Sequence, residues 1–148
     1  MLKYNINQLF NKDMITVELF GKQKQIQVFS RGDNRIGKGT IFELSKEELD
    51  ILNWFLNNIN IENYKLQILD YCNYNYREYS DKQITIDDIE NEINIFAIAI
   101  TIKERMKSDN TFPDISFYGD CKSDEEHGVC IGFKNKKFIG IGQQNWIL

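Results

Sequence analysis

The stretch Ile95 to Lys103, IFAIAITIK, decides the fold class. Its first six residues are all apolar, so it lacks the alternation of a strand that has one face in water. A strand that is covered on both faces has no such alternation, because neither side meets solvent. We therefore expect residues 95–103 to form a central strand with other elements packed on both of its faces.

Other segments are predicted to extend the sheet. Residues 14–19 and 24–29 flank Gly21-Lys22-Gln23, which indicates a hairpin, and residues 40–44 are predicted to form a further strand. The segment Asp114–Cys121 (DISFYGDC) alternates and is predicted as a strand, with these residues on one side: Ile115, Phe117 and Cys121.

The C-terminal region is predicted to form a second hairpin. Residues 129–133 and 138–142 flank a turn at Asn135-Lys136, in which the asparagine supplies a positive φ. The register that follows pairs Phe133 with Phe138, Gly132 with Ile139, and Ile131 with Gly140. Large residues then face small ones, which leaves room for a segment to pack over the hairpin. The tail that follows contains Trp146 and is too apolar to stay free, so we expect it to pack.

Three helices are predicted between the strands. Ser45-Lys-Glu-Glu48 is a capping box, so a helix should run to about Asn58. A second helix is expected over Ile61–Tyr79, and a short acidic one begins at Thr85. Each helix is expected to turn one stripe of residues inward. For the three helices in chain order, these stripes are Leu49, Leu52, Leu56 and Ile59; then Leu69, Cys72, Tyr76 and Tyr79; then Ile86, Ile89 and Ile93. The prediction is an α+β fold, a mainly antiparallel sheet of about five to six strands with two or three helices packed on one face. Residues 1–148 are taken as a single domain.

Composition narrows the function. The net charge of −4 argues against a nucleic-acid partner, because a protein that binds nucleic acid needs a basic face to neutralise the phosphates. Three widely spaced cysteines indicate a reducing compartment. The N-terminus does not resemble a signal peptide, and no apolar run is long enough to span a bilayer. We therefore expect a soluble cytoplasmic protein without a membrane partner, either a monomer or a homodimer. The Asn, Ile and Lys content suits an AT-rich bacterial genome.

One loop partly matches a nucleotide-binding motif. Gly32 to Lys38 fits the first seven positions of the phosphate-binding loop, but Gly39 replaces the hydroxyl that holds magnesium. A strand-like segment follows where a helix is required, so the sequence predicts a surface loop and no cofactor.

The most distinctive segment is the acidic turn, residues 120–128 (DCKSDEEHG). Calcium is disfavoured, because Lys122 and Glu125 stand at EF-hand positions 3 and 6, which require an oxygen ligand and a glycine. Zinc accepts thiolate and imidazole, and the donors Cys121, His127 and Cys130 lie close in sequence. If residues 129–133 form a strand, however, Cys130 alternates away from its neighbours. No metal ligand is therefore assigned.

His127 is the only histidine, so any histidine-dependent catalysis must pass through it. With Glu126, Asp124 or Cys121 it has the groups of a general base or of an activated thiolate. No serine nucleophile motif accompanies them, and no catalytic residue is assigned. The simpler interpretation is a structural turn, in which His127 bonds a neighbour and Gly128 adopts a backbone angle that other residues avoid. An enzyme or metal-dependent domain centred on Cys121, Glu126 and His127 stays the alternative.

Three residues are predicted to contact a partner. Tyr74 falls off the apolar stripe of its helix, and exposed aromatic residues serve as interface anchors. Asp120 and Glu125 belong to the acidic turn, where charge favours capture of a basic partner.

The C-terminal segments also resemble a known family. Residues 115–121 (ISFYGDC), the turn Asp124–Gly128 (DEEHG), the hairpin and Gly142-Gln143 resemble a family of uncharacterised bacterial domains. That family carries a strand ending in Cys, an acidic Glu-His-Gly turn and a final β-hairpin. Lys122-Ser123 departs from the family pattern, which has a polar-aromatic pair such as Thr-Trp there. The resemblance implies a non-catalytic protein-binding role of the immunity type, in which the domain neutralises a toxin.

Overall fold

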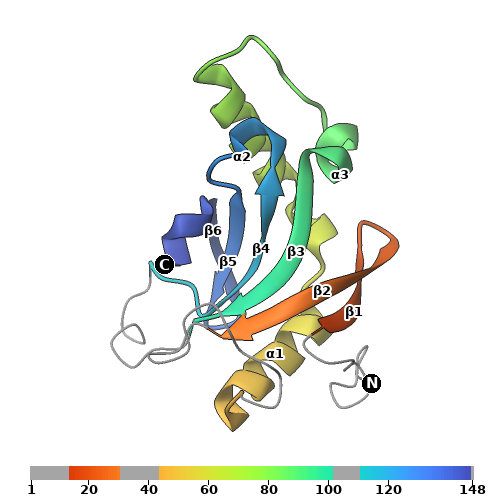
Figure 1. The fold of residues 1–148 in the computed structure, drawn as a ribbon, viewed down its shortest axis with the longest axis vertical. Coiled ribbons are helices and arrows are strands. Elements are labelled where there is room, and N and C mark those ends of the chain that lie inside the picture. The colour runs from red at the N-terminus through yellow and green to blue at the C-terminus, as the bar shows by residue number, and fades with distance from the viewer. Residues whose placement is uncertain (1–13, 31–43, 102–110, 148) are drawn as a thin grey trace.

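The computed structural model describes residues 14–30, 44–101 and 111–147. The loop with the partial nucleotide motif lies outside the described residues. So does the strand predicted at residues 40–44, apart from Leu44, which is buried. Within the described part, the fold is the predicted α+β arrangement (Figure 1).

In the described residues, six strands form one sheet in sequence order, and among these six only β2 and β3 pair in parallel. The strands are β1 (Met14–Leu19), β2 (Lys22–Ser30), β3 (Ile93–Ile100), β4 (Ile115–Cys121), β5 (Val129–Lys134) and β6 (Lys137–Gly142). The parallel pair follows from the chain path, because all the main helices lie between β2 and β3 and carry the chain back across the sheet. The sheet is therefore mainly antiparallel, as predicted.

Strand β3 has the central position expected from its sequence. Ile98 and Ile100 belong to the core under the helices, whereas Ala97 and Ala99 belong to a second cluster on the opposite face. All four side chains are fully buried. A β-bulge near Phe96 shifts the register against β4, so the alternation resumes one residue later.

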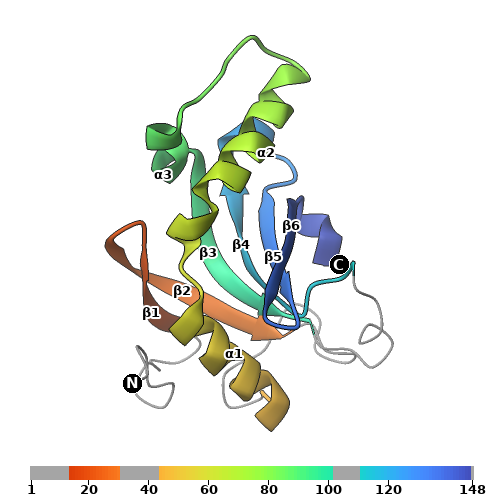
Figure 2. The same ribbon diagram turned by 180° about the vertical axis from the view of Figure 1, so that it is seen from behind.

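Two helices, α1 (Lys46–Asn58) and α2 (Lys65–Arg77), cover one face of the sheet (Figure 2). The short 3-10 helix η3 (Ile61–Tyr64) precedes α2. A second 3-10 helix, η4 (Ile86–Asp88), precedes the short helix α3 (Ile89–Glu92). The capping box of α1 is confirmed, because the Glu48 backbone N–H donates to Ser45 Oγ at 3.1 Å and the Ser45 N–H donates back to the Glu48 carboxylate at 3.0 Å.

The main core lies between these helices and the sheet. Phe55 is at its centre, with ring centroids 4.8 Å from Phe117 and 5.3 Å from Phe133. The stripe predicted for α1 omitted Phe55, although Leu52 and Leu56 are buried as expected.

Several local predictions were wrong. Tyr79 is exposed rather than inward, because α2 ends at Arg77. Ile86 is 40% exposed, because a 3-10 turn lacks the helical spacing that would align it with Ile89. The first hairpin turns at Phe20-Gly21, where both residues have positive φ, instead of at residues 21–23.

The last hairpin turns at Asn135-Lys136 as predicted, and Phe133 pairs with Phe138. Beyond that pair the predicted register was wrong, because a bulge at Ile139 places Gly132 opposite Gly140 and Ile131 opposite Ile141.

The bulge aligns three small residues under the packed tail. The indole of Trp146 lies over Gly132, Gly140 and Gly142, and a Cβ added at Gly132 would come within 2.9 Å of the ring. The expected packing of this part of the tail on the hairpin is therefore confirmed for Trp146.

Candidate functional site

The acidic turn connects β4 to β5 beside the C-terminal half of α2 (Figure 1). It begins as a 3-10 helix, η6 (Lys122–Asp124), and the Gly128 N–H closes it by donating to the Asp124 carbonyl at 2.9 Å. Asp124 Oδ1 accepts from the His127 backbone N–H at 3.2 Å and lies 2.9 Å from His127 Nδ1. The histidine thus ties the turn to its own aspartate.

The segment after β6 holds the turn from a second side. Gln143 donates through Nε2 to Asp124 Oδ2 at 3.0 Å. The Gln144 backbone N–H donates to the His127 carbonyl at 2.7 Å, and its side chain donates to the Gly119 carbonyl at 2.6 Å. Both oxygens of Asp124 therefore accept hydrogen bonds inside the fold.

Gly128 has the left-handed conformation that the sequence predicted, with φ +64°. An added Cβ would come within 2.2 Å of the Gln144 Nε2 and 2.4 Å of the Gly119 carbonyl oxygen. The Gly128 carbonyl also accepts from the Tyr71 hydroxyl of α2 at 2.9 Å. Both the angle and the space at this position require glycine.

Cys121 ends β4 with its side chain in the main core. Its Sγ lies 3.8 Å from Cys72 Sγ of α2 and 3.0 Å from Ser123 Oγ. The contact with the Cys72 sulfur lowers the pKa of Cys121. Hydrogen bonds with the Ser123 hydroxyl and with the Ser123 and Asp124 N–H groups lower it further, against the effect of burial. The same sulfur contact, together with burial, raises the pKa of the Cys72 thiol.

The structure does not bring the other sequence-predicted chemical groups together. Cys130 lies in the cluster on the opposite face of the sheet from Cys121, and burial raises its pKa to about 12. Glu126 is 85% exposed, with its carboxylate 4.0 Å from His127 Nε2. Over residues 14–30, 44–101 and 111–147, no three His, Cys, Asp or Glu side chains gather closely enough to hold a metal ion.

A pocket of about 310 Å³ opens beside the turn, between α3, the start of β3 and the end of β4. Asp120, Cys121 and Glu125 are among the residues that line it, so the two predicted partner-binding carboxylates lie at one opening. Glu92 also lines it and is buried, with its carboxylate accepting from the Tyr76 hydroxyl at 2.7 Å.

Negative charge is concentrated at this end of the molecule, which we call the acidic end (residues 78–92 and 120–127). These two segments contain ten carboxylates and two lysines. Two lysines of β2 lie against it. Lys22 Nζ is 2.7 Å from the Glu90 carboxylate. Lys24 donates to Asn94 and interacts electrostatically with Asp120. The excess of six negative charges still exceeds the net charge of −4 of the whole chain.

Tyr79 lies against the acidic end, whereas Tyr74, on α2, has the Arg77 guanidinium 5.9 Å from the centroid of its ring. Tyr74 is 58% exposed, as the sequence predicted, and Tyr79 is 64% exposed. The Tyr79 hydroxyl donates to the Ser123 carbonyl at 3.0 Å, which fixes one edge of its ring against the turn. Exposed aromatic residues serve as anchors at protein-binding surfaces.

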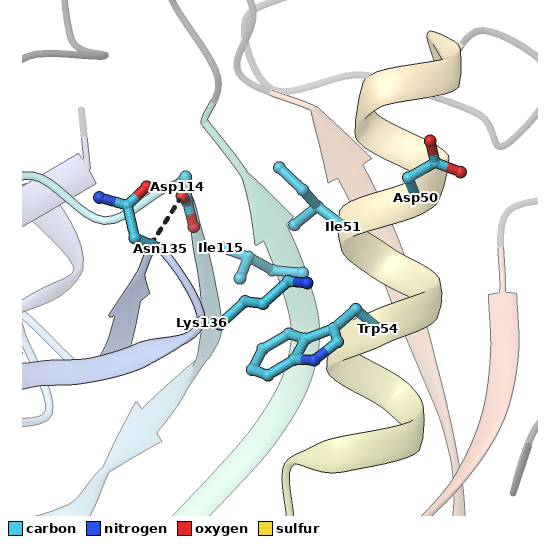
Figure 3. Close-up of a pocket in the computed structure, with 7 residues that line it drawn as sticks. All are labelled: Asp50, Ile51, Trp54, Asp114, Ile115, Asn135 and Lys136. Carbon is cyan, nitrogen blue, oxygen red and sulfur yellow. Dashed lines mark hydrogen bonds between the residues drawn. The ribbon is translucent and has the colours of Figure 1, made fainter.

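A second pocket, of about 230 Å³, lies at the other end between α1 and the β5–β6 turn (Figure 3). Lys136 Nζ lies 5.6 Å from the centroid of the Trp54 ring, so a cation of the chain already occupies the face of the indole. Burial raises the pKa of Asp114, whose carboxylate accepts from the Asn135 N–H at 3.2 Å. The sequence did not predict this pocket, because α1 and the turn are distant in the chain.

In the described part of the chain, the helices are too short or too polar to cross a membrane. No curated protein and no solved structure matches the chain. Residues 2–148 match one family over nearly the whole length, which confirms the expected membership of an uncharacterised domain family. The chain belongs to the family described as Domain of unknown function (DUF6985).

Proposed function

We propose that this chain is a non-catalytic protein-binding module that uses its acidic end to hold a basic protein partner. The observation that carries the proposal is the concentration of exposed carboxylates beside Tyr79, next to the helix α2 that carries the exposed Tyr74. Aromatic anchors supply contact area, and complementary charge speeds capture and selects the partner. The resemblance noted in the sequence suggests the partner class, a toxin that a bacterial immunity protein neutralises in the cytoplasm.

The alternative, an enzyme centred on Cys121, Glu126 and His127, has less support. His127 bonds Asp124, Glu126 extends into solvent, and Cys121 contacts Cys72 and Ser123. A binding role needs only the outer surface of the turn, which these internal contacts hold in place.

The test uses the proteins encoded by the two flanking genes. Each is expressed alone and together with this chain, and growth of the host is followed. Relief of growth inhibition by this chain, with a complex recovered from the purified pair, supports the proposal. If neither neighbour inhibits growth or binds, the toxin-neutralising role is wrong.

Matched charge variants then locate the surface. Glu125→Gln with Glu126→Gln removes two charges from the acidic end, whereas Glu47→Gln with Glu62→Gln removes two from the distant helix starts. We expect the first pair to slow association several-fold at low salt and the second to change it little. Equal effects would contradict the assignment of the surface, and His127→Gln should retain binding if it folds.

A further inference from the structure

We propose that Cys72 and Cys121 form a reversible modification site, an intramolecular disulfide made when a small neutral hydroperoxide enters the acidic pocket. The inference is independent of the proposed binding function. It rests on the position of two thiols that are 49 residues apart in sequence and face each other across the contact between α2 and β4.

The first support is geometric. The two Sγ atoms lie 3.8 Å apart, so a disulfide bond of about 2.05 Å requires them to approach by less than about 2 Å. Both cysteines are free. Cys130, the remaining cysteine, belongs to the cluster on the opposite face of the sheet, so it cannot compete for either sulfur.

The second support is the hydrogen-bond chain around the sulfurs. Asn75 donates through Nδ2 to Ser123 Oγ at 3.1 Å, which leaves the serine hydrogen free to donate to Cys121 Sγ at 3.0 Å. Either sulfur can donate across the 3.8 Å contact between Cys72 and Cys121, whereas the 3.0 Å contact with Ser123 Oγ is made by Cys121. Cys121 is therefore the sulfur that ionises first, and Cys72 retains its proton, as the opposite directions of their pKa shifts indicate.

The pocket selects the oxidant. Cys121 is one of the residues that line the pocket, whose volume of about 310 Å³ admits a small molecule. Cys121 is 1% exposed, so the last step to Sγ passes between the packed side chains around it. Glu92, Asp120 and Glu125 also line the pocket, against one lining cation, Lys122, so the pocket has a negative balance that repels an anionic oxidant such as glutathione disulfide. Hydrogen peroxide is small and neutral, and it meets no such barrier.

The reaction has two balanced steps. The Cys121 thiolate attacks one peroxide oxygen, so that an S–O bond forms, the O–O bond breaks, and the departing hydroxide takes a proton to become water. Cys72 then attacks Cys121 Sγ, the S–S bond forms, and the hydroxyl leaves as water with the proton of Cys72. The two thiols lose two electrons in total, and one peroxide is reduced to two waters.

The test treats the reduced, purified full-length protein with hydrogen peroxide and maps its peptides without reduction. We expect one linkage, Cys72 to Cys121, which a dithiol reductant reverses, while Cys130 stays free for alkylation after unfolding. A linkage that includes Cys130, or disulfides only between molecules, would overturn the proposal. So would the absence of any linkage until the protein unfolds.

Variants assign the roles of the two sulfurs. Cys121→Ser should consume peroxide at least about tenfold more slowly than the wild type, whereas Cys130→Ser should match the wild type. Cys72→Ser should accumulate a sulfenic acid on Cys121 that dimedone traps. If glutathione disulfide formed a mixed disulfide with Cys121 faster than peroxide reacted, the oxidant class would be wrong. The wild-type peptide map decides the linkage even if a variant fails to fold.

Discussion

Replacing Gly128 with alanine tests whether the acidic turn is a structural support for the last hairpin. The left-handed backbone at φ +64° costs a non-glycine residue about 1 kcal/mol. The new Cβ would also lie 2.4 Å from the backbone oxygen of Gly119, which cannot rotate away, and such overpacking costs roughly 1–3 kcal/mol. Displacing the Gln144 side chain from the same oxygen removes a hydrogen bond that contributes about 1 kcal/mol. We expect Gly128→Ala to lower the free energy of unfolding by about 3–5 kcal/mol.

Gly21 provides the matched control. It also has a left-handed backbone, with φ +77°, but no atom lies within 4 Å of a Cβ placed there. Gly21→Ala should therefore cost only the conformational term of about 1 kcal/mol. Urea unfolding of both variants, followed by circular dichroism and tryptophan fluorescence, gives the two free energies and the slope m. If Gly128→Ala were within about 1 kcal/mol of Gly21→Ala at an unchanged m, crowding at the turn would not matter and the reasoning would fail.

Three further predictions follow from the same contacts. Asp124→Asn removes a charged acceptor from His127 and should lower the unfolding free energy by about 1–3 kcal/mol in urea at neutral pH; an unchanged midpoint would contradict its role in the turn. Burial raises the pKa of Tyr71 to about 12 from an unfolded value of 10.0. Because the folded pKa is the higher one, the stabilising contribution is complete below pH 10.0 and is lost as the pH rises towards 12. Urea midpoints should fall over that range, less steeply in Tyr71→Phe, and equal slopes would contradict the assignment. Closing the loop between Cys72 and Cys121 should raise the stability of the oxidised protein by up to about 4 kcal/mol relative to the reduced protein, and a decrease would show that the bond strains the fold.

Short-range patterns were sufficient to predict most elements of the fold. The capping box at Ser45 and Glu48 fixes the start of α1 through contacts within one helical turn, so the sequence alone identifies it. The apolar run from Ile95 to Ile100 indicates a strand covered on both sides, because apolar residues at successive positions place apolar side chains on both faces of the strand. These signals do not depend on any distant part of the chain.

Contacts between distant segments account for the errors. The predicted register of the last hairpin assumed regular pairing from the Asn135 turn, but Trp146 packs closely only where glycines of both strands are aligned, and the bulge at Ile139 aligns them. The contact between Cys72 and Cys121 was not predicted for the same reason. Helical periodicity placed Cys72 inward and strand alternation placed Cys121 inward, yet neither pattern specifies which inward residues meet.

The alternation of β4 gives the acidic turn two separate faces. Asp120 is exposed and Cys121 is buried, because successive side chains of a strand point to opposite sides. If β4 shifted by one residue against β3, the Asp120 carboxylate would point into the core and the Cys121 thiol would point outward. The register of β4 therefore fixes the positions of both groups. A disulfide between Cys121 and α2 would join the element that carries Asp120 to the helix that carries Tyr74. The proposed oxidation site and the proposed binding surface therefore share β4 and α2, and a bond between the two sulfurs would restrain these elements relative to each other without adding any group to the surface.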